Sequence, residues 1–141
     1  MSQEQIFDIL RKTKTVAVVG LSKEPQKDSY KVSAYMQQHG YRIIPVNPFA
    51  QEVLGEKSYR SLLDIPLELQ QAIDVVDVFR KSEDVPAIVE QAIQMKAKSG
   101  RSFVVWMQLG IVNEQAAQAA RQAGLIVVMD KCLMVEHHRL T

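Results

Sequence analysis

The residue types best suited to binding chemistry in this sequence stand in short polar segments that directly follow apolar runs. The first segment, with the helix expected to begin near residue 29, provides these candidates: Gly20, Leu21, Ser22, Ser29, Tyr30 and Lys31. Glycine lets the backbone turn sharply, serine offers a hydroxyl and an amide, and a helix N-terminus carries free N–H groups with a partial positive charge. The segment therefore predicts a pyrophosphate site, with a plain strand-to-helix turn and solvated lysines as the alternative.

Three further segments add candidates at the ends of later apolar runs: Asn47 and Pro48, then Phe79 and Arg80, then Gln108 and Gly110. The planar guanidinium of Arg80 suits a phosphate, although a surface ion pair would also account for it. Phe79 belongs either to the core or against an adenine ring. Gln108 is expected to face the ligand through a hydrogen bond, and Gly110 to let the ligand approach the backbone closely.

The first segment lacks the fingerprint of dinucleotide-binding proteins. That fingerprint, Gly-x-Gly-x-x-Gly, needs two glycines beyond Gly20, and an acidic residue after the second strand binds the NAD ribose. Here the second apolar run ends in Asn47 and Pro48. The sequence therefore disfavours NAD and favours a nucleotide with a 2′- or 3′-phosphate on its ribose, because an acid at that place would repel the added phosphate.

Catalytic machinery is hard to find in the chain. The sequence contains no Gly-x-Ser-x-Gly elbow, no Walker loop and no zinc-type spacing of cysteine and histidine. Cys132 lies beside Lys131, whose charge would favour a reactive thiolate, but we interpret it as an inert buried thiol. His137 and His138 fall in an expected polar tail after residue 130, and we interpret both as surface residues.

Five short apolar runs, rich in valine and isoleucine, alternate with segments of helical periodicity. The runs cover residues 15–19, 43–46, 73–79, 103–107 and 125–129. Their continuous apolar character is typical of strands buried on both faces of a parallel sheet. The alternation predicts an α/β fold, a Rossmann-like three-layer sandwich with a five-stranded parallel sheet in the order 3-2-1-4-5. No linker divides residues 1–141, so we expect one domain with its ligand at the C-terminal edge of the sheet.

Capping residues agree with the expected helices. Ser2 with Gln5 predicts a capping box for a leading helix that ends near residue 11. Ser82 is predicted to cap a helix over residues 83–98, and Asn113 to cap the helix that follows the fourth run.

Composition restricts the partners. The formal net charge is +1, so no basic field exists that would drive binding to nucleic acid. No apolar run approaches the roughly 18 residues of a membrane span, and the polar N-terminus does not resemble a signal peptide. The single cysteine fits a reducing compartment. We therefore expect a cytoplasmic protein without membrane contact.

Taken together and in order, these segments resemble the small stand-alone CoA-binding proteins, which are similar to the CoA-binding domain of the succinyl-CoA synthetase α subunit. The resemblance covers residues 13–140 and rests on Val18-Val19-Gly20-Leu21-Ser22, Ser29-Tyr30-Lys31-Val32, Val46-Asn47-Pro48, Asp77-Val78-Phe79-Arg80, Trp106-Met107-Gln108-Leu109-Gly110 and Asp130-Lys131-Cys132. In the synthetase family a lysine-bearing, glycine-rich segment after the second strand meets the CoA phosphates. No lysine of residues 49–57 matches it cleanly.

The resemblance implies non-catalytic binding of coenzyme A (CoA) or an acyl-CoA. Gly20 and Ser22 would hold the diphosphate, Asn47 and Pro48 would border the adenosine, and Gln108 would approach the pantetheine. Phe79 and Arg80 would flank the nucleotide. The alternatives are an NAD(P)-binding regulatory domain, or a redox or acyl-transfer enzyme that uses Cys132 beside bound CoA. A protein partner is possible, but no residue marks one.

Overall fold

The computed structural model of the chain describes residues 1–140. Five parallel strands form the central sheet: β1 (Thr15–Val19), β2 (Arg42–Val46), β5 (Val75–Val78), β6 (Val104–Met107) and β7 (Ile126–Val128). The helices are α1 (Gln3–Lys12), α2 (Asp28–Gln38), α3 (Leu67–Gln70), α4 (Val85–Ser99), α5 (Glu114–Gln122) and α6 (Leu133–Leu140), with 3-10 turns at Leu62–Asp64 and Ser82–Asp84. A small antiparallel hairpin joins β3 (Glu52–Val53) to β4 (Glu56–Lys57).

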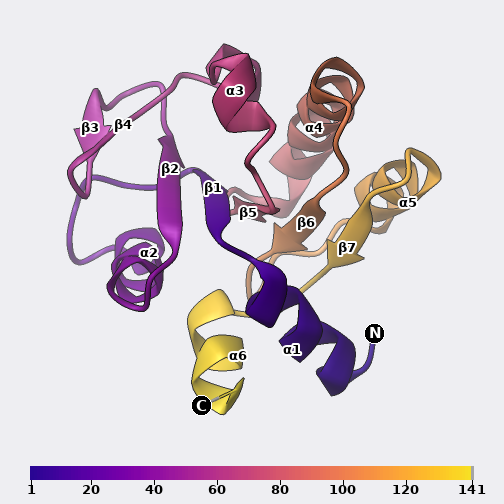
Figure 1. Cartoon of the computed structure of the whole chain (residues 1–141), viewed down its shortest axis with the longest axis horizontal. Coiled ribbons are helices and arrows are strands. Elements are labelled where there is room, and N and C mark those ends of the chain that lie inside the picture. Colours follow the sequence, from indigo (N-terminus) through magenta and orange to yellow (C-terminus); the bar gives the residue numbers. More distant parts are fainter. Residues whose placement is uncertain (141) are drawn as a thin grey trace.

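Helices cover both faces of the sheet and complete the predicted three-layer α/β sandwich. In the view of Figure 1, α3, α4 and α5 lie above the sheet and α1, α2 and α6 lie below it. Valine and isoleucine side chains of the strands pack against both layers, which gives one apolar core on each face. Their continuous apolar pattern thus reflects burial on two sides, and the predicted fold class is confirmed.

The position of one strand differs from the prediction. β5, which corresponds to residues 73–79, pairs with β1 and β6 instead of lying outside β2. The place beside β2 belongs to Tyr59, which makes a parallel bridge to Val46. If the segment at Tyr59 is counted as the third strand, the order across the sheet is Tyr59, β2, β1, β5 and β6. This is the 3-2-1-4-5 pattern, and β7 adds one further strand beside β6.

Pro45 explains why β2 lies at the border of the five-stranded sheet. A proline has no N–H, so it is tolerated in a strand only where the ladder does not need that donor. The carbonyl of Pro45 faces outward, where it accepts from the amide of Tyr59 at 3.1 Å. The missing N–H faces the same way, since both groups of one residue point to one side of a strand. β2 therefore lies at the border, and β5 pairs with the other side of β1, so that the sheet reverses its winding between β1 and β5.

The helix ends follow their capping residues with one exception. Ser2 and Gln5 form the predicted capping box, and the Asn113 side chain accepts from the amide of Ala116 at the start of α5. Ser82 does not cap a helix. It lies in a 3-10 turn before α4, and its hydroxyl accepts from the amide of Val112 at 3.1 Å.

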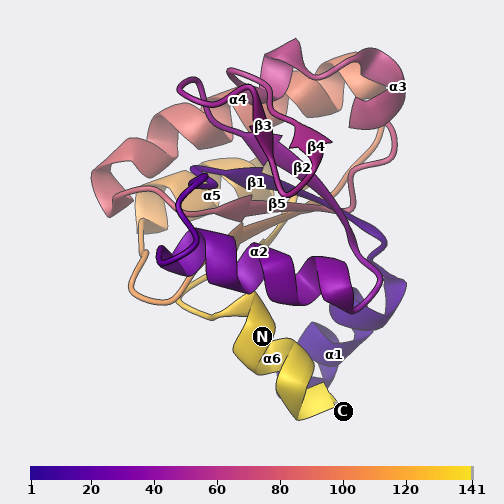
Figure 2. The same cartoon turned by 90° about the vertical axis from the view of Figure 1, so that its left-hand side faces the viewer.

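The expected polar tail is a helix. α6 packs against α1 and α2 on the lower face of the sheet, as Figure 2 also shows. Leu133 and His137 are buried there, so the interpretation of His137 as a surface residue is wrong. The Gln3 amide group in α1 donates to the Glu136 carboxylate in α6 at 2.8 Å, which joins the two ends of the described chain.

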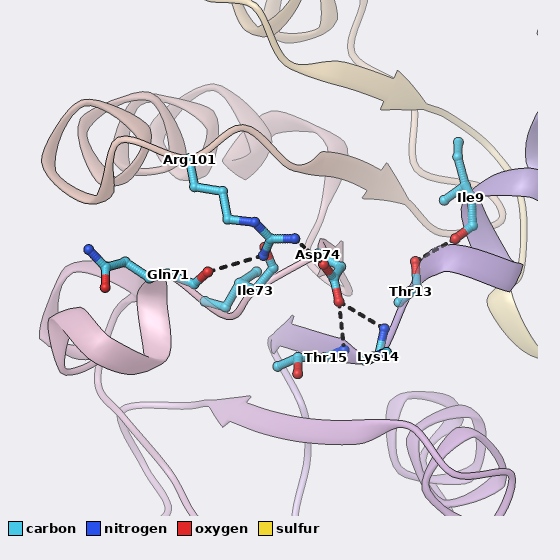
Figure 3. A network of polar contacts seen from close by, with 8 residues as sticks. All are labelled: Ile9, Thr13, Lys14, Thr15, Gln71, Ile73, Asp74 and Arg101. Atoms are coloured by element: carbon cyan, nitrogen blue, oxygen red, sulfur yellow. Dashed lines mark hydrogen bonds and ion pairs between the residues drawn. The ribbon is translucent and has the colours of Figure 1, made fainter.

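The ionised carboxylate of Asp74 connects several segments at the N-terminal edge of the sheet, opposite the C-terminal edge where the ligand is expected (Figure 3). Asp74 accepts from the amides of Lys14 and Thr15 at 2.8 and 3.0 Å. Arg101 binds the other Asp74 oxygen and donates to the Ile73 carbonyl at 2.7 Å. Burial opposes ionisation of Asp74, but these donors outweigh it and hold its pKa below the ordinary value. The network joins the starts of β1 and β5 to the segment that leads into β6.

We expect Arg101→Ala to lower the free energy of unfolding by about 1–2 kcal/mol at pH 7, because it removes charge-assisted bonds that are partly exposed to water. Urea unfolding followed by circular dichroism measures the change. Arg121→Ala, at an exposed position in the last turn of α5, serves as the charge-matched control and should stay within about 0.5 kcal/mol. Equal losses in both variants would contradict a special role for Arg101.

Candidate functional site

Gly20 lies where the turn after β1 touches the end of β5. Its φ is 88°, and an added Cβ would stand 2.4 Å from the carbonyl oxygen of Phe79 and 2.9 Å from Cδ of Arg80. Backbone bonds hold this contact on both sides. The Gly20 amide donates to Val46 and the Phe79 amide donates to Val19, each at 2.9 Å. Only glycine fits here, and the contact brings together the residues predicted from the first three segments.

The turn that follows Gly20 is held in shape by its own polar groups. The Ser22 amide donates to the Ser29 hydroxyl at 3.0 Å, and the Glu24 amide donates to the Ser22 hydroxyl at 3.0 Å. The Ser22 amide is therefore engaged within the turn. Both hydroxyls act as acceptors in these bonds and retain their own hydrogen. Ser22 is half-buried and can donate this hydrogen to an anion, whereas Ser29 is buried beneath the turn.

Other predicted residues surround this turn. The Asn47 side chain connects the turn after β1 to the loop after β2. Its Nδ2 donates to the Leu21 carbonyl at 2.9 Å, and its Oδ1 accepts from the Phe49 amide at 2.8 Å. In the first turn of α2, Tyr30 is half-buried against the sheet and Lys31 is exposed. Asn47 thus fixes the shape of the edge by bonding to protein groups.

A cavity of about 320 Å³ opens beside Gly20. Pro48 at the end of β2 forms one wall, and Ala87 and Ile88 of α4 form the other. Arg80 lines it and pairs with Asp84, which also lines the cavity, at 3.1 Å. The remaining charged groups at this cavity are those of Arg60 and Glu83. Its volume lies at the lower end of the usual range for small-molecule pockets.

A second cavity of about 750 Å³ adjoins the first, because Pro48 and Arg60 line both. Lys57 also lines this wider hollow, and Phe49 stands at its border with 86% of its surface exposed. Sequence reasoning missed Arg60. It lies near the site only because the neighbouring Tyr59 pairs with β2, and a single bridging residue leaves no periodic pattern to recognise.

Gln108 and Gly110 follow β6 at the same edge. Gln108 is 3% exposed, so its side chain is turned inward, where its Nε2 donates to Oδ1 of Asp77 at 2.7 Å. Gly110 is exposed, has a φ of 83°, and donates its amide to Asp130 at 2.7 Å. Gly110 therefore offers open backbone to a ligand, whereas Gln108 is held within the protein.

Asp77 is a buried acid that sequence reasoning did not single out. It is 0% exposed, and its Oδ2 has no hydrogen-bond partner. Burial raises its pKa to about 8, and the bonds from Gln108 and the Val78 amide offset only part of this effect. Asp77 is therefore protonated at neutral pH. The sequence did contain a signal for this residue, because Asp77 is an acid within an otherwise apolar strand.

Cys132 and the histidines lie on the lower face of the sheet. Cys132 is half-buried against the core there. His137 bonds to the Tyr35 hydroxyl at 2.9 Å and contacts the rings of His39 and Tyr41. Burial, aided by the charges of His39 and His138, lowers the pKa of His137. These contacts attach α6 to α2.

The doubly wound sheet, the glycine turn at its point of reversal and the adjoining cavities define a Rossmann-like ligand-binding domain. The chain belongs to the CoA-binding domain family, whose model matches residues 14–138. Within residues 1–140, no helix is long and apolar enough to cross a membrane.

Similar proteins include the uncharacterized protein YneT of Bacillus subtilis (strain 168), which is 43% identical over 136 residues, with 96% of this chain and 94% of that protein covered. The structure of a hypothetical protein from Pyrococcus horikoshii OT3 matches with a TM-score of 0.88 and 44% identity, over 99% of this chain and 92% of that one. An ADP-forming acetate–CoA ligase II of Archaeoglobus fulgidus is 36% identical over 87 residues. That match covers 60% of this chain and 12% of the ligase.

The protonated Asp77 predicts a pH-dependent effect of Asp77→Asn. The folded chain keeps a proton that unfolded Asp77 loses above about pH 4, so ionisation lowers stability progressively as the pH rises from about 4 to about 8. Asparagine has no such penalty. The melting temperature of the variant relative to the original chain should therefore rise from pH 5 to pH 8 and then level off.

Thermal unfolding in a pH series measures this difference. Glu90→Gln is the control, because Glu90 is an exposed acid on α4. The difference in melting temperature between Glu90→Gln and the original chain should not change between pH 5 and pH 8. A constant difference for Asp77→Asn as well would show that Asp77 is ionised in the folded protein.

Proposed function

We propose that this chain binds CoA or an acyl-CoA at the C-terminal edge of its sheet and carries out no chemistry on it. The observation that carries the proposal is the contact of Gly20 with Phe79 and Arg80, which leaves bare backbone beside a cavity at the point of reversal. Ligands of open α/β sheets bind at such points. Membership of the CoA-binding domain family supports CoA as the ligand.

The site divides into regions that suit the parts of CoA. The Ser22 hydroxyl and the N-terminus of α2 would meet the diphosphate, since free N–H groups and a donor hydroxyl there favour an anion, and Ser29 would hold the turn in place through the Ser22 amide. The adenosine would enter the 320 Å³ cavity between Pro48 and α4. The pantetheine arm would pass toward Gly110, where the backbone is exposed.

The non-catalytic role rests on the state of Cys132, the candidate nucleophile. The chain spans about an eighth of the Archaeoglobus fulgidus ligase that it matches. Cys132 is half-buried against the core. A single cysteine also fits our proposal of a cytoplasmic location. If the original chain catalyses a redox or acyl-transfer reaction of CoA, and Cys132→Ala loses that activity while still binding CoA, the chain would instead be an enzyme.

Calorimetric titration of ligand-stripped protein tests the function directly. We expect saturable binding of CoA and no detectable heat with NAD, because the first turn has one glycine and Asn47 is occupied by the Leu21 carbonyl. Binding of NAD in preference to CoA would assign the site to a nicotinamide cofactor. Binding of neither ligand would contradict the proposed function.

Arg80 is expected to contribute to the affinity because its side chain lies over Gly20 and lines the nucleotide cavity. Arg80→Ala should weaken CoA binding by about 1.5–3 kcal/mol, the range for a hydrogen bond to a charged group. Lys81→Ala removes an adjacent exposed charge that does not line the cavity and should leave the affinity nearly unchanged. Unchanged affinity in Arg80→Ala would place Arg80 outside the site.

A further inference from the structure

Arg60 stands between the two adjoining cavities and lines both of them. Its backbone is fixed by the neighbouring residue, since the Tyr59 amide donates to the Pro45 carbonyl at 3.1 Å and the Asn47 amide donates to the Tyr59 carbonyl at 2.8 Å. The start of the Arg60 side chain is therefore held beside the end of β2. An exposed arginine at this place is positioned by sheet pairing and not by a mobile loop.

All donors of the Arg60 guanidinium are open to a ligand, whereas the other cations at these cavities each have a contact within the protein. Arg80 is paired with Asp84 at 3.1 Å, and the Lys57 ammonium lies over the ring of Tyr59 at 5.5 Å from its centre. Arg60 makes no hydrogen bond or ion pair with any residue of the described part of the chain. Its five N–H donors form a rigid fork that matches the oxygens of a phosphate.

The end of β2 is where open α/β sheets of this kind recognise the ribose of the adenosine. An acidic side chain there would bind two ribose hydroxyls, but Asn47 holds this place and its side chain bonds to Leu21 and Phe49. An adenosine in the 320 Å³ cavity would have its ribose at the mouth, beside Pro48 and Arg60. A cation in place of an acid favours a ribose that carries a phosphate.

We propose that Arg60 is the specificity-determining residue for the 3′-phosphate of CoA, so that it distinguishes CoA from dephospho-CoA. This inference rests on the proposed function and goes beyond it, since CoA binding by the glycine turn alone would not discriminate between the two ligands. Lys57 also lines the second cavity, but we assign the phosphate to Arg60 because the Lys57 ammonium already lies over the Tyr59 ring.

Calorimetric titration with CoA and with dephospho-CoA tests the role of Arg60. We expect the original chain to prefer CoA, and Arg60→Ala to weaken CoA binding about ten- to a hundredfold while changing dephospho-CoA binding less than twofold. Arg42→Ala is the control, because Arg42 is an exposed arginine at the opposite end of β2 and its loss changes the net charge equally. Arg42→Ala should leave the preference for CoA intact.

Each other outcome has a distinct meaning. A preference for CoA that persists in Arg60→Ala overturns the assignment of Arg60, and equal binding of both ligands by the original chain overturns phosphate recognition while leaving CoA binding in place. An equal loss in Arg42→Ala and Arg60→Ala would reduce the effect to net charge and overturn the inference. Binding of neither ligand would overturn the proposed function itself.

Discussion

The candidate site depends on one steric constraint, the contact between the turn after β1 and the end of β5. With no side chain at Gly20, the carbonyl of Phe79 approaches to a distance that a Cβ would not permit. The contact lies where the sheet reverses its winding, and bonds from Gly20 to β2 and from Phe79 to β1 hold it. Loops that are distant in sequence thereby share one edge, and the cavity beside α4 opens next to it.

Two acids near the ends of β5 hold the sheet in opposite ways. Asp74 precedes the strand, is ionised, and collects two backbone amides and Arg101. Asp77 lies within the strand, is fully buried and protonated, and accepts from Gln108. The difference follows from the supply of donors, because a buried carboxylate keeps its charge only where enough donors surround it. The N-terminal end of β5 is thus held by charge, and the neighbourhood of Asp77 by a neutral hydrogen bond from Gln108.

Much of the fold could be predicted from the apolar runs, because strands buried on both faces leave a continuous pattern. The position of Pro45 was also informative, since its missing N–H suits the border of the five strands, but the prediction did not use it. Other features depend on contacts that no local pattern records. Arg60 reaches the site through one bridging residue, Gln108 turns inward to meet Asp77, and His137 is buried because Tyr35 and Tyr41 surround it. Gly20, Pro48 and Arg80 were predicted for the site, and the structure brings them to one cavity.

The helices at the two ends of the described chain, α1 and α6, pack against each other. The Gln3–Glu136 bond places both terminal helices together on the lower face of the sheet, and α1 leads into the N-terminal end of β1, away from the glycine turn (Figure 2). With its two ends side by side, such a fold can be carried within a larger polypeptide without rearrangement of the loops around Gly20, and the ligase of Archaeoglobus fulgidus contains a stretch similar to it.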